Sequence, residues 1–113
     1  MTRQGSKRGA ETYLDEGNRC LTASNFPAAT SAYQRALELN PRSVEAAYNC
    51  GVAFHRQGHL DQAIACYKQA IRLAPGLAEA HFNLAHALSE VNRPEEAEAA
   101  YRATMRLQPQ NAA

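Results

Sequence analysis

The sequence has 113 residues, of which 45% are apolar, so it is long enough for one compact domain or a short array of repeats. Its 12 Lys and Arg against 11 Asp and Glu give a formal net charge of +1, which argues against a general nucleic-acid binder because such a protein needs a basic surface. Residues 1–9 lack the apolar run of a secretory signal and no stretch is as long as a membrane span, so we expect a cytoplasmic protein that does not insert into membranes.

The sequence repeats itself every 34 residues. Prolines show this first, because Pro41, Pro75 and Pro109 follow one another at that interval. Four more sets of residues keep the same register: Ala29, Ala63 and Ala97; Tyr33, Tyr67 and Tyr101; Leu39, Leu73 and Leu107; and Gly17, Gly51 and Ala85. A fixed period of this length is typical of arrays built from small supersecondary units. We therefore divide most of the chain into units 10–43, 44–77 and 78–111.

The two ends of the chain fall outside these units. Residues 1–9 place Arg3, Lys7 and Arg8 among glycine and serine, which predicts a flexible basic leader. Three cations are too few to hold such a leader on a membrane by themselves. Residues 112–113 form a short tail.

Each unit is expected to form two helices. In chain order, we predict helices at 10–23, 27–40, 44–57, 61–74, 78–91 and 95–108. Pro27 and Pro94 suit the first turn of a helix, whereas Pro75 ends one because it cannot continue the hydrogen-bond ladder. In the middle unit, the first helix is expected to stop near Gly58, and Asp61 is expected to cap the second. No segment alternates with period two, so we expect no strand.

Small residues are expected where the two helices of a unit approach each other. Gly51 lies on the first helix of its unit and Ala63 on the second, which lets the two backbones come close. Tyr67 and Phe54 would then fill the wedge between neighbouring units. A single helix pair cannot bury both of its faces, so the pairs must stack on one another.

These residues resemble the tetratricopeptide repeat, whose pattern places aromatic residues, Leu-Gly, alanines and a proline at fixed positions. The middle unit carries the pattern with Gly51, Phe54, Ala63, Tyr67, Ala70 and Pro75. The resemblance covers about nine-tenths of the chain and is specific for fold, since the pattern residues are packing residues. It implies an all-α fold, a right-handed α-solenoid of three helix-turn-helix repeats, with a concave face lined by the first helices and a role in protein–protein interaction.

One stripe on each first helix points away from the partner helix. When each unit is numbered from its first residue, positions 2, 6, 9 and 13 share this stripe, and position 5 lies beside it. These positions predict a peptide-binding surface formed by Asn18, Tyr48, Asn49, Val52, Arg56, Phe82, Asn83 and His86. The carboxamides of Asn49 and Asn83 can pair with the N–H and C=O groups of an extended peptide. Asparagine at position 6 also occurs in the family where it serves only solubility and local hydrogen bonding.

Glutamates occupy position 2 of all three units, at Glu11, Glu45 and Glu79. They would repel acidic ligands and favour basic ones. The simpler interpretation, which we favour, is that they complement the positive ends of the helix dipoles.

Co-chaperones of this family hold a C-terminal carboxylate with a clamp of five residues. The corresponding places in this chain hold Leu14, Asn18, Asn49, Glu79 and Asn83. Asn18 and Asn49 match the clamp, but all three of its cations are missing and Glu79 carries the opposite charge. We therefore expect no binding to the acidic C-terminal tails of the major heat-shock chaperones.

No residues are arranged in the sequence for catalysis, so we expect no enzyme, no cofactor and no metal. His55 and His59 form an H-x-x-x-H pair that lacks a third ligand, and a solvated turn is the better interpretation. Cys20, Cys50 and Cys66 are an odd number without C-x-x-C spacing, which favours free thiols.

The last unit is expected to be partly open. Glu98 replaces the counterpart of Ile64, which suits contact with water, but Tyr101 and Met105 are expected to stay exposed without a polar capping helix. This predicts weak self-association through that end.

Three roles fit the pattern. The leading one is a free-standing peptide-binding adaptor, or scaffold. The second is the substrate-docking segment of a larger enzyme of the O-linked N-acetylglucosamine transferase type, whose asparagine ladder resembles Asn49 and Asn83 but is broken here by Asp15. The third is a chaperone of bacterial secretion.

Overall fold

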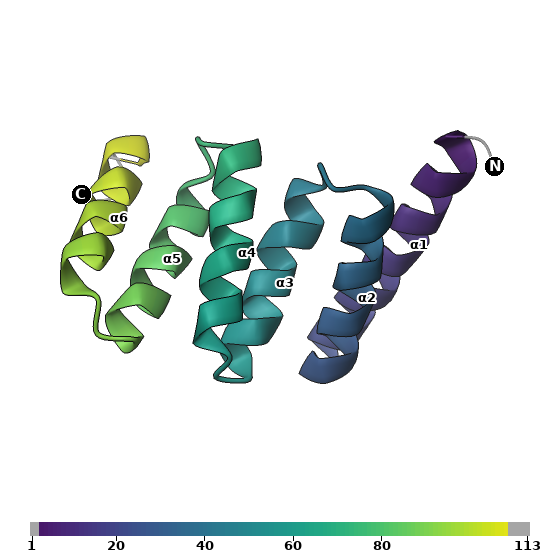
Figure 1. Cartoon of the computed structure of the whole chain (residues 1–113), viewed down its shortest axis with the longest axis horizontal. Coiled ribbons are helices and arrows are strands. Elements are labelled where there is room, and N and C mark those ends of the chain that lie inside the picture. Colours follow the sequence, from purple (N-terminus) through teal and green to yellow (C-terminus); the bar gives the residue numbers. More distant parts are fainter. Residues whose placement is uncertain (1–2, 109–113) are drawn as a thin grey trace.

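The chain folds into six α-helices in the computed structural model, which describes residues 3–108, with side chains from residue 9 onward. The helices are α1 (Arg3–Thr22), α2 (Phe26–Leu39), α3 (Val44–Arg56), α4 (Leu60–Leu73), α5 (Ala78–Glu90) and α6 (Pro94–Leu107). They pack in sequential pairs, and Figure 1 shows them side by side in one elongated row with the two ends of the chain far apart. The expected all-α solenoid of paired helices is confirmed.

The helix boundaries follow the sequence pattern except at the start. From α2 to α6, every helix begins and ends within one residue of its expected position. In contrast, α1 begins at Arg3 rather than at residue 10, so residues 3–9, expected to form a flexible leader, continue the first helix. No proline interrupts this stretch, and at its end Ala10 is buried and Gly9 lies close to Leu39 of α2. Residues 1–2 of the expected leader and the tail 112–113 lie outside the described residues.

The turn inside each helix pair has the same backbone geometry in all three units. Its central residue has a positive φ of 60° at Ser24, 79° at Gly58 and 61° at Asn92, and these three positions are 34 residues apart. The next backbone N–H reaches back to the preceding helix each time, as His59 does to the carbonyl of Phe54 at 3.0 Å. After this turn α4 begins at Leu60, so Asp61 lies in its first turn and His59, not Asp61, precedes the helix.

The core is built from alanine, with one tyrosine wedged into each of the first two pairs. Tyr33 and Tyr67 are 0% and 1% exposed, and their rings lie against Gly17 and Gly51. A methyl group added at Gly51 would be 2.6 Å from a Tyr67 ring carbon, closer than any real contact. Phe54 packs on the cluster that contains Tyr67, as expected from the sequence. This close approach packs α1 against α2 and α3 against α4.

Candidate functional site: the first-helix face

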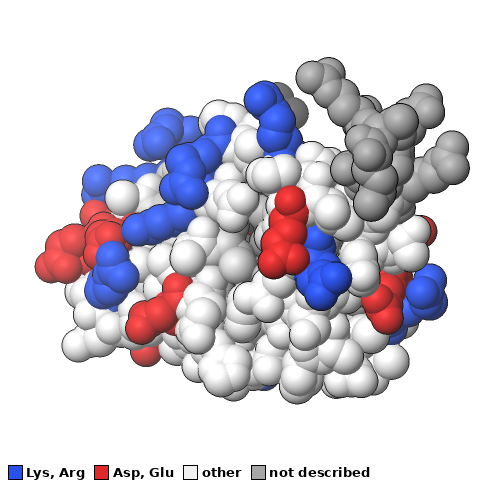
Figure 2. All heavy atoms as spheres, turned by 45° about the vertical axis from the view of Figure 1, so that its right-hand side comes forward, with Lys and Arg blue, Asp and Glu red and all other residues white. Residues whose placement is uncertain are grey.

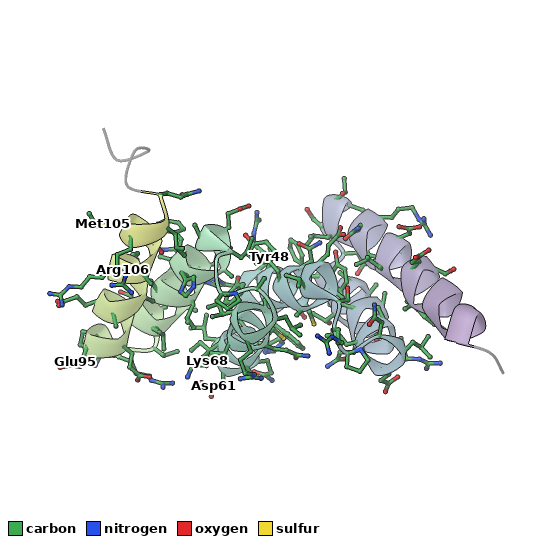
Figure 3. The ribbon with its side chains drawn as sticks, turned by 90° about the horizontal axis from the view of Figure 1, so that it is seen from above. Tyr48, Asp61, Lys68, Glu95, Met105 and Arg106 are labelled. Carbon is green, nitrogen blue, oxygen red and sulfur yellow. The ribbon has the colours of Figure 1, made fainter. Side chains whose placement is uncertain are left out.

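The eight predicted binding residues lie on α1, α3 and α5. We call the exposed side of these three helices the first-helix face. Figure 3 places Tyr48 of α3 on one side of the array, and Asp61 and Lys68 of α4 on the opposite side. The predicted residues on this face are Asn18 of α1; Tyr48, Asn49, Val52 and Arg56 of α3; and Phe82, Asn83 and His86 of α5.

Asn18 joins the first two repeats. Its Oδ1 accepts a hydrogen bond from the Tyr33 hydroxyl at 2.6 Å and another from Asn49 Nδ2 at 3.0 Å. Its Nδ2 donates to Glu45 Oε2 at 3.1 Å. The oxygen and the nitrogen of the Asn18 amide are therefore both hydrogen-bonded within the protein. Glu45, in the first turn of α3, points toward α1. Burial above all raises the pKa of Tyr33, so this hydroxyl keeps the proton that it donates.

Asn83 makes the corresponding link between the second and third repeats. Its Nδ2 donates to the Tyr48 hydroxyl at 2.8 Å. Burial, and next the negative charge of Glu79, raise the pKa of Tyr48, so its hydroxyl stays protonated and keeps a hydrogen to donate. Asn49 and Asn83 each use one amide hydrogen in these links, and a carboxamide has a second donor and an oxygen acceptor for a ligand.

A hollow of about 400 Å³ opens on this face between α3 and α5. It is lined by Tyr48, Val52, His55, Arg56, Tyr67, Asn83, His86 and Glu90. Five of the predicted residues line it, whereas Asn18, Asn49 and Phe82 lie outside it. Phe82 is 50% exposed, and its ring meets Tyr101 of α6 with the centroids 6.0 Å apart. Apolar contact surface and hydrogen-bonding groups therefore lie side by side, as they do in many ligand-binding sites.

Three residues of this hollow, His55, Tyr67 and Glu90, were not in the predicted binding set, although Glu90 holds position 13 of the same stripe. His55 and Tyr67 are hydrogen-bonded, with 3.2 Å between Nδ1 and the hydroxyl oxygen, and Nε2 of the same ring contacts Oε1 of Glu90. Glu90 also lies 3.9 Å from Nδ1 of His86, one helical turn earlier on α5. The four-residue spacing of His86 and Glu90 was the available signal in the sequence. His59, which the sequence paired with His55, is exposed and has its ring against Phe54 instead.

Charge is distributed unevenly over the molecule. In the view of Figure 2, Lys and Arg gather along the upper edge with acidic groups beside them, and most of the described surface in that view is uncharged. On the first-helix face, the Arg56 guanidinium lies over the Phe26 ring, 5.7 Å from its centroid. Glu11, Glu45, Glu79 and Glu90 are all exposed. This mixture gives no continuous basic surface in that view to pair with nucleic-acid phosphates.

The three cysteines differ in their burial. Cys50 is buried, Cys20 and Cys66 are half-buried, and all three thiols are free. The contact with the Cys66 thiol and burial both raise the pKa of Cys50, so this group stays a thiol and packs as a small apolar residue, as expected.

A second hollow, of about 500 Å³, lies among α4, α5 and α6. Its floor is apolar, with Ile71, Leu84 and Leu88 among its lining residues. It holds none of the predicted binding residues and no amide side chain, so the first-helix face is the better candidate for pairing with a peptide backbone.

Comparison with known proteins identifies the repeat. Two models described as tetratricopeptide repeat match residues 14–78 and 55–113. The small glutamine-rich tetratricopeptide repeat-containing protein 2 of Mycosarcoma maydis is 42% identical over 55 residues, which are 49% of this chain and 16% of that protein. None of the described helices is long and apolar enough to cross a membrane.

Solved structures show the same architecture. MamA is 26% identical and superposes with a TM-score of 0.87, covering 95% of this chain and 62% of MamA. The first tetratricopeptide domain of Spaghetti (RPAP3), solved with an HSP90 peptide, is 19% identical with a TM-score of 0.87, covering 91% of this chain and 82% of that chain. The chain thus spans less than two thirds of MamA and about a sixth of its curated relative.

Proposed function

The chain belongs to the tetratricopeptide repeat family, a family of protein–protein interaction modules, and we propose that its first-helix face binds an extended peptide segment of a partner protein. The observation that carries the proposal is the hollow between α3 and α5, where the Asn83 amide and the Tyr48 hydroxyl stand beside half-exposed apolar surface. The RPAP3 domain, whose fold this chain shares, was solved with a peptide bound.

The polar groups suit a peptide backbone. Asn49 and Asn83 lie 34 residues apart, at the same position of consecutive repeats, so their amides form a short row across the face. Each amide can accept one N–H and donate to one C=O of an extended chain. Such pairing recognises the peptide backbone, so any preference for particular peptide side chains depends on the neighbouring apolar groups, Val52 and Phe82.

The dimensions of the face set the length of the ligand. Neighbouring helices pack about 8–10 Å apart, so three first helices span about 20 Å. An extended chain advances about 3.3 Å per residue, so the face accommodates roughly six residues. The exposed acidic groups on this face, Glu45 and Glu79 among them, favour basic or neutral peptides over acidic ones.

Two biological settings share this activity. A free-standing adaptor is the first. The second is a binding segment within a longer protein. Both settings use the same face, so the binding experiment applies to either.

The test begins with a peptide selected from a phage-displayed library of random segments of about seven residues. Its affinity is measured by calorimetry for the unmodified chain and for Asn49→Ala combined with Asn83→Ala. If only one hydrogen bond per amide is counted, at about 0.5–1.5 kcal/mol each, the double variant should bind at least roughly 5- to 150-fold more weakly. Gln62→Ala is the matched control, because Gln62 is an exposed amide on α4. Equal affinity of the double variant and the control would place the binding site elsewhere.

A further inference from the structure

His55, His86 and Glu90 form a cluster whose ligand atoms all lie within 4.8 Å of one another. His86 and Glu90 are one turn apart on α5, and His55 reaches them from α3. We propose that this cluster binds a divalent transition-metal ion of the zinc class and thereby bridges the second and third repeats.

The donor set fits such an ion. Imidazole nitrogen and carboxylate oxygen are ordinary zinc ligands, and two imidazoles with one carboxylate form a known three-ligand set that leaves a fourth position open. Ligand atoms around a tetrahedral zinc are about 3.3 Å apart, given bonds of about 2.0–2.1 Å. Here Nδ1 of His86 is 3.9 Å from Oε1 of Glu90, while Nε2 of His55 contacts that oxygen directly. Small rotations therefore make room for an ion in place of the hydrogen bond.

The side chains have the freedom that this adjustment needs. His86 and Glu90 are 60% and 45% exposed, and both line the open hollow of about 400 Å³, which gives the ion a path from solvent. His55 is only 17% exposed and acts as the fixed member of the set. Among the described residues, Arg56 is the one Lys or Arg that lines this hollow, and its guanidinium lies over the Phe26 ring.

A buried hydroxyl orients the fixed ligand. Metal-binding histidines usually use their second ring nitrogen to hold the ring in place through a hydrogen bond. Nδ1 of His55 has this bond with the Tyr67 hydroxyl, at 3.2 Å. The Tyr67 hydroxyl can either donate to Nδ1 or accept from it. When Nε2 holds a metal, Nδ1 carries the hydrogen and Tyr67 accepts it.

The test is independent of the proposed peptide binding, because zinc is titrated without any peptide. The tag-free chain is stripped with a chelator and titrated with zinc chloride by calorimetry under reducing conditions. One equivalent should bind, and zinc should raise the thermal midpoint because it joins α3 to α5. Glu90→Gln and His86→Gln should each weaken binding by at least about 100-fold and abolish the thermal shift, since each removes a ligand.

Two further variants separate this site from other histidines and from folding defects. Tyr67→Phe keeps the ring that packs against Gly51 but removes the orienting hydroxyl, and it should weaken zinc binding by about tenfold or more. His59→Gln removes an exposed histidine outside the cluster and should change nothing. Cobalt in place of zinc should show the visible bands of a tetrahedral site with no thiolate charge-transfer band. Failure to saturate, equal affinity in Glu90→Gln, an equal loss in His59→Gln, or a thiolate band would each overturn the proposal.

Discussion

Replacing Gly51 by alanine should destabilise the chain, although the same change usually strengthens a helix. Gly51 lies within α3, where exchanging glycine for alanine ordinarily contributes about 1 kcal/mol of helix propensity. At this position, however, the new methyl group would lie 2.6 and 2.7 Å from two ring carbons of Tyr67. That ring is 1% exposed and its hydroxyl is bonded to His55, so it has nowhere to move without breaking other contacts.

The magnitude follows from the two opposing effects. Overpacking of a core side chain typically costs about 1–3 kcal/mol. With two close ring contacts we expect the upper half of that range, so after the gain in helix propensity the free energy of unfolding should fall by about 1–2 kcal/mol. Since each 1 kcal/mol shifts the thermal midpoint of a domain of about this size by about 4–8 °C, the midpoint should then drop by roughly 4–16 °C. Since the clash pushes Tyr67 away from His55, zinc affinity should weaken in the same variant.

The assay is thermal unfolding followed by circular dichroism, with Gly76→Ala as the matched control. Nothing lies within 4 Å of a methyl group added at Gly76, so this variant should be as stable as the parent or slightly more stable. If Gly51→Ala matched or exceeded the stability of the unmodified chain, the close approach of α3 and Tyr67 could not be what holds the repeat together.

Four further outcomes are expected. Gly58→Ala should lower the thermal midpoint because φ is 79° at Gly58, and Gly58→Asn should lower it less because Asn92 adopts the same geometry at φ 61°. Arg93 hydrogen-bonds to Glu96 and lowers the pKa of that carboxyl. The ionised carboxylate therefore stabilises the fold at neutral pH, and this stabilisation is lost as the pH falls through the lowered pKa. The difference in thermal midpoint between the parent and Glu96→Gln should accordingly vanish on acidification. Met105 is 60% exposed at the open end, so sedimentation should show weak, concentration-dependent association that Met105→Glu reduces, and monomers of both at high concentration would contradict this. In fluorescence anisotropy, an acidic chaperone-tail peptide should not bind the unmodified chain but should bind the triple variant Leu14→Lys, Glu79→Lys and Asn83→Arg; clear micromolar binding by the parent would refute the reasoning.

Local structure could be predicted from the sequence because the same pattern occurs in all three units. The turn position shows how: Ser24, Gly58 and Asn92 are different residues, yet they adopt one conformation because the surrounding pattern is shared. The start of α1 could not be predicted in this way, because no repeated pattern covers it. Residues 3–9 precede the first full unit, and with two glycines their composition favours a flexible segment, whereas in the structure they extend a helix that packs on α2 near Leu39.

The contacts between repeats could not be predicted in the same way. Asn18 meets Asn49, position 9 of one repeat against position 6 of the next, whereas Asn83 meets Tyr48, position 6 against position 5. The two junctions therefore use different pairs of positions, so no common rule could be found by aligning the units. The contact between His55 and Glu90 could not be predicted either, because it depends on how the second and third helix pairs stack.

The asparagines that we propose to bind a peptide also link the repeats, and this affects how any binding experiment should be interpreted. Removing Asn49 leaves Asn18 still bonded to Glu45 of α3, so the first junction keeps a hydrogen bond. Removing Asn83 takes away the donor to Tyr48, whose half-buried hydroxyl must then find water or turn. The Asn83 variant should therefore lose more stability than the Asn49 variant, while peptide affinity should fall in both. A loss of affinity that followed thermal stability alone would indicate that these amides position the repeats rather than contact the peptide.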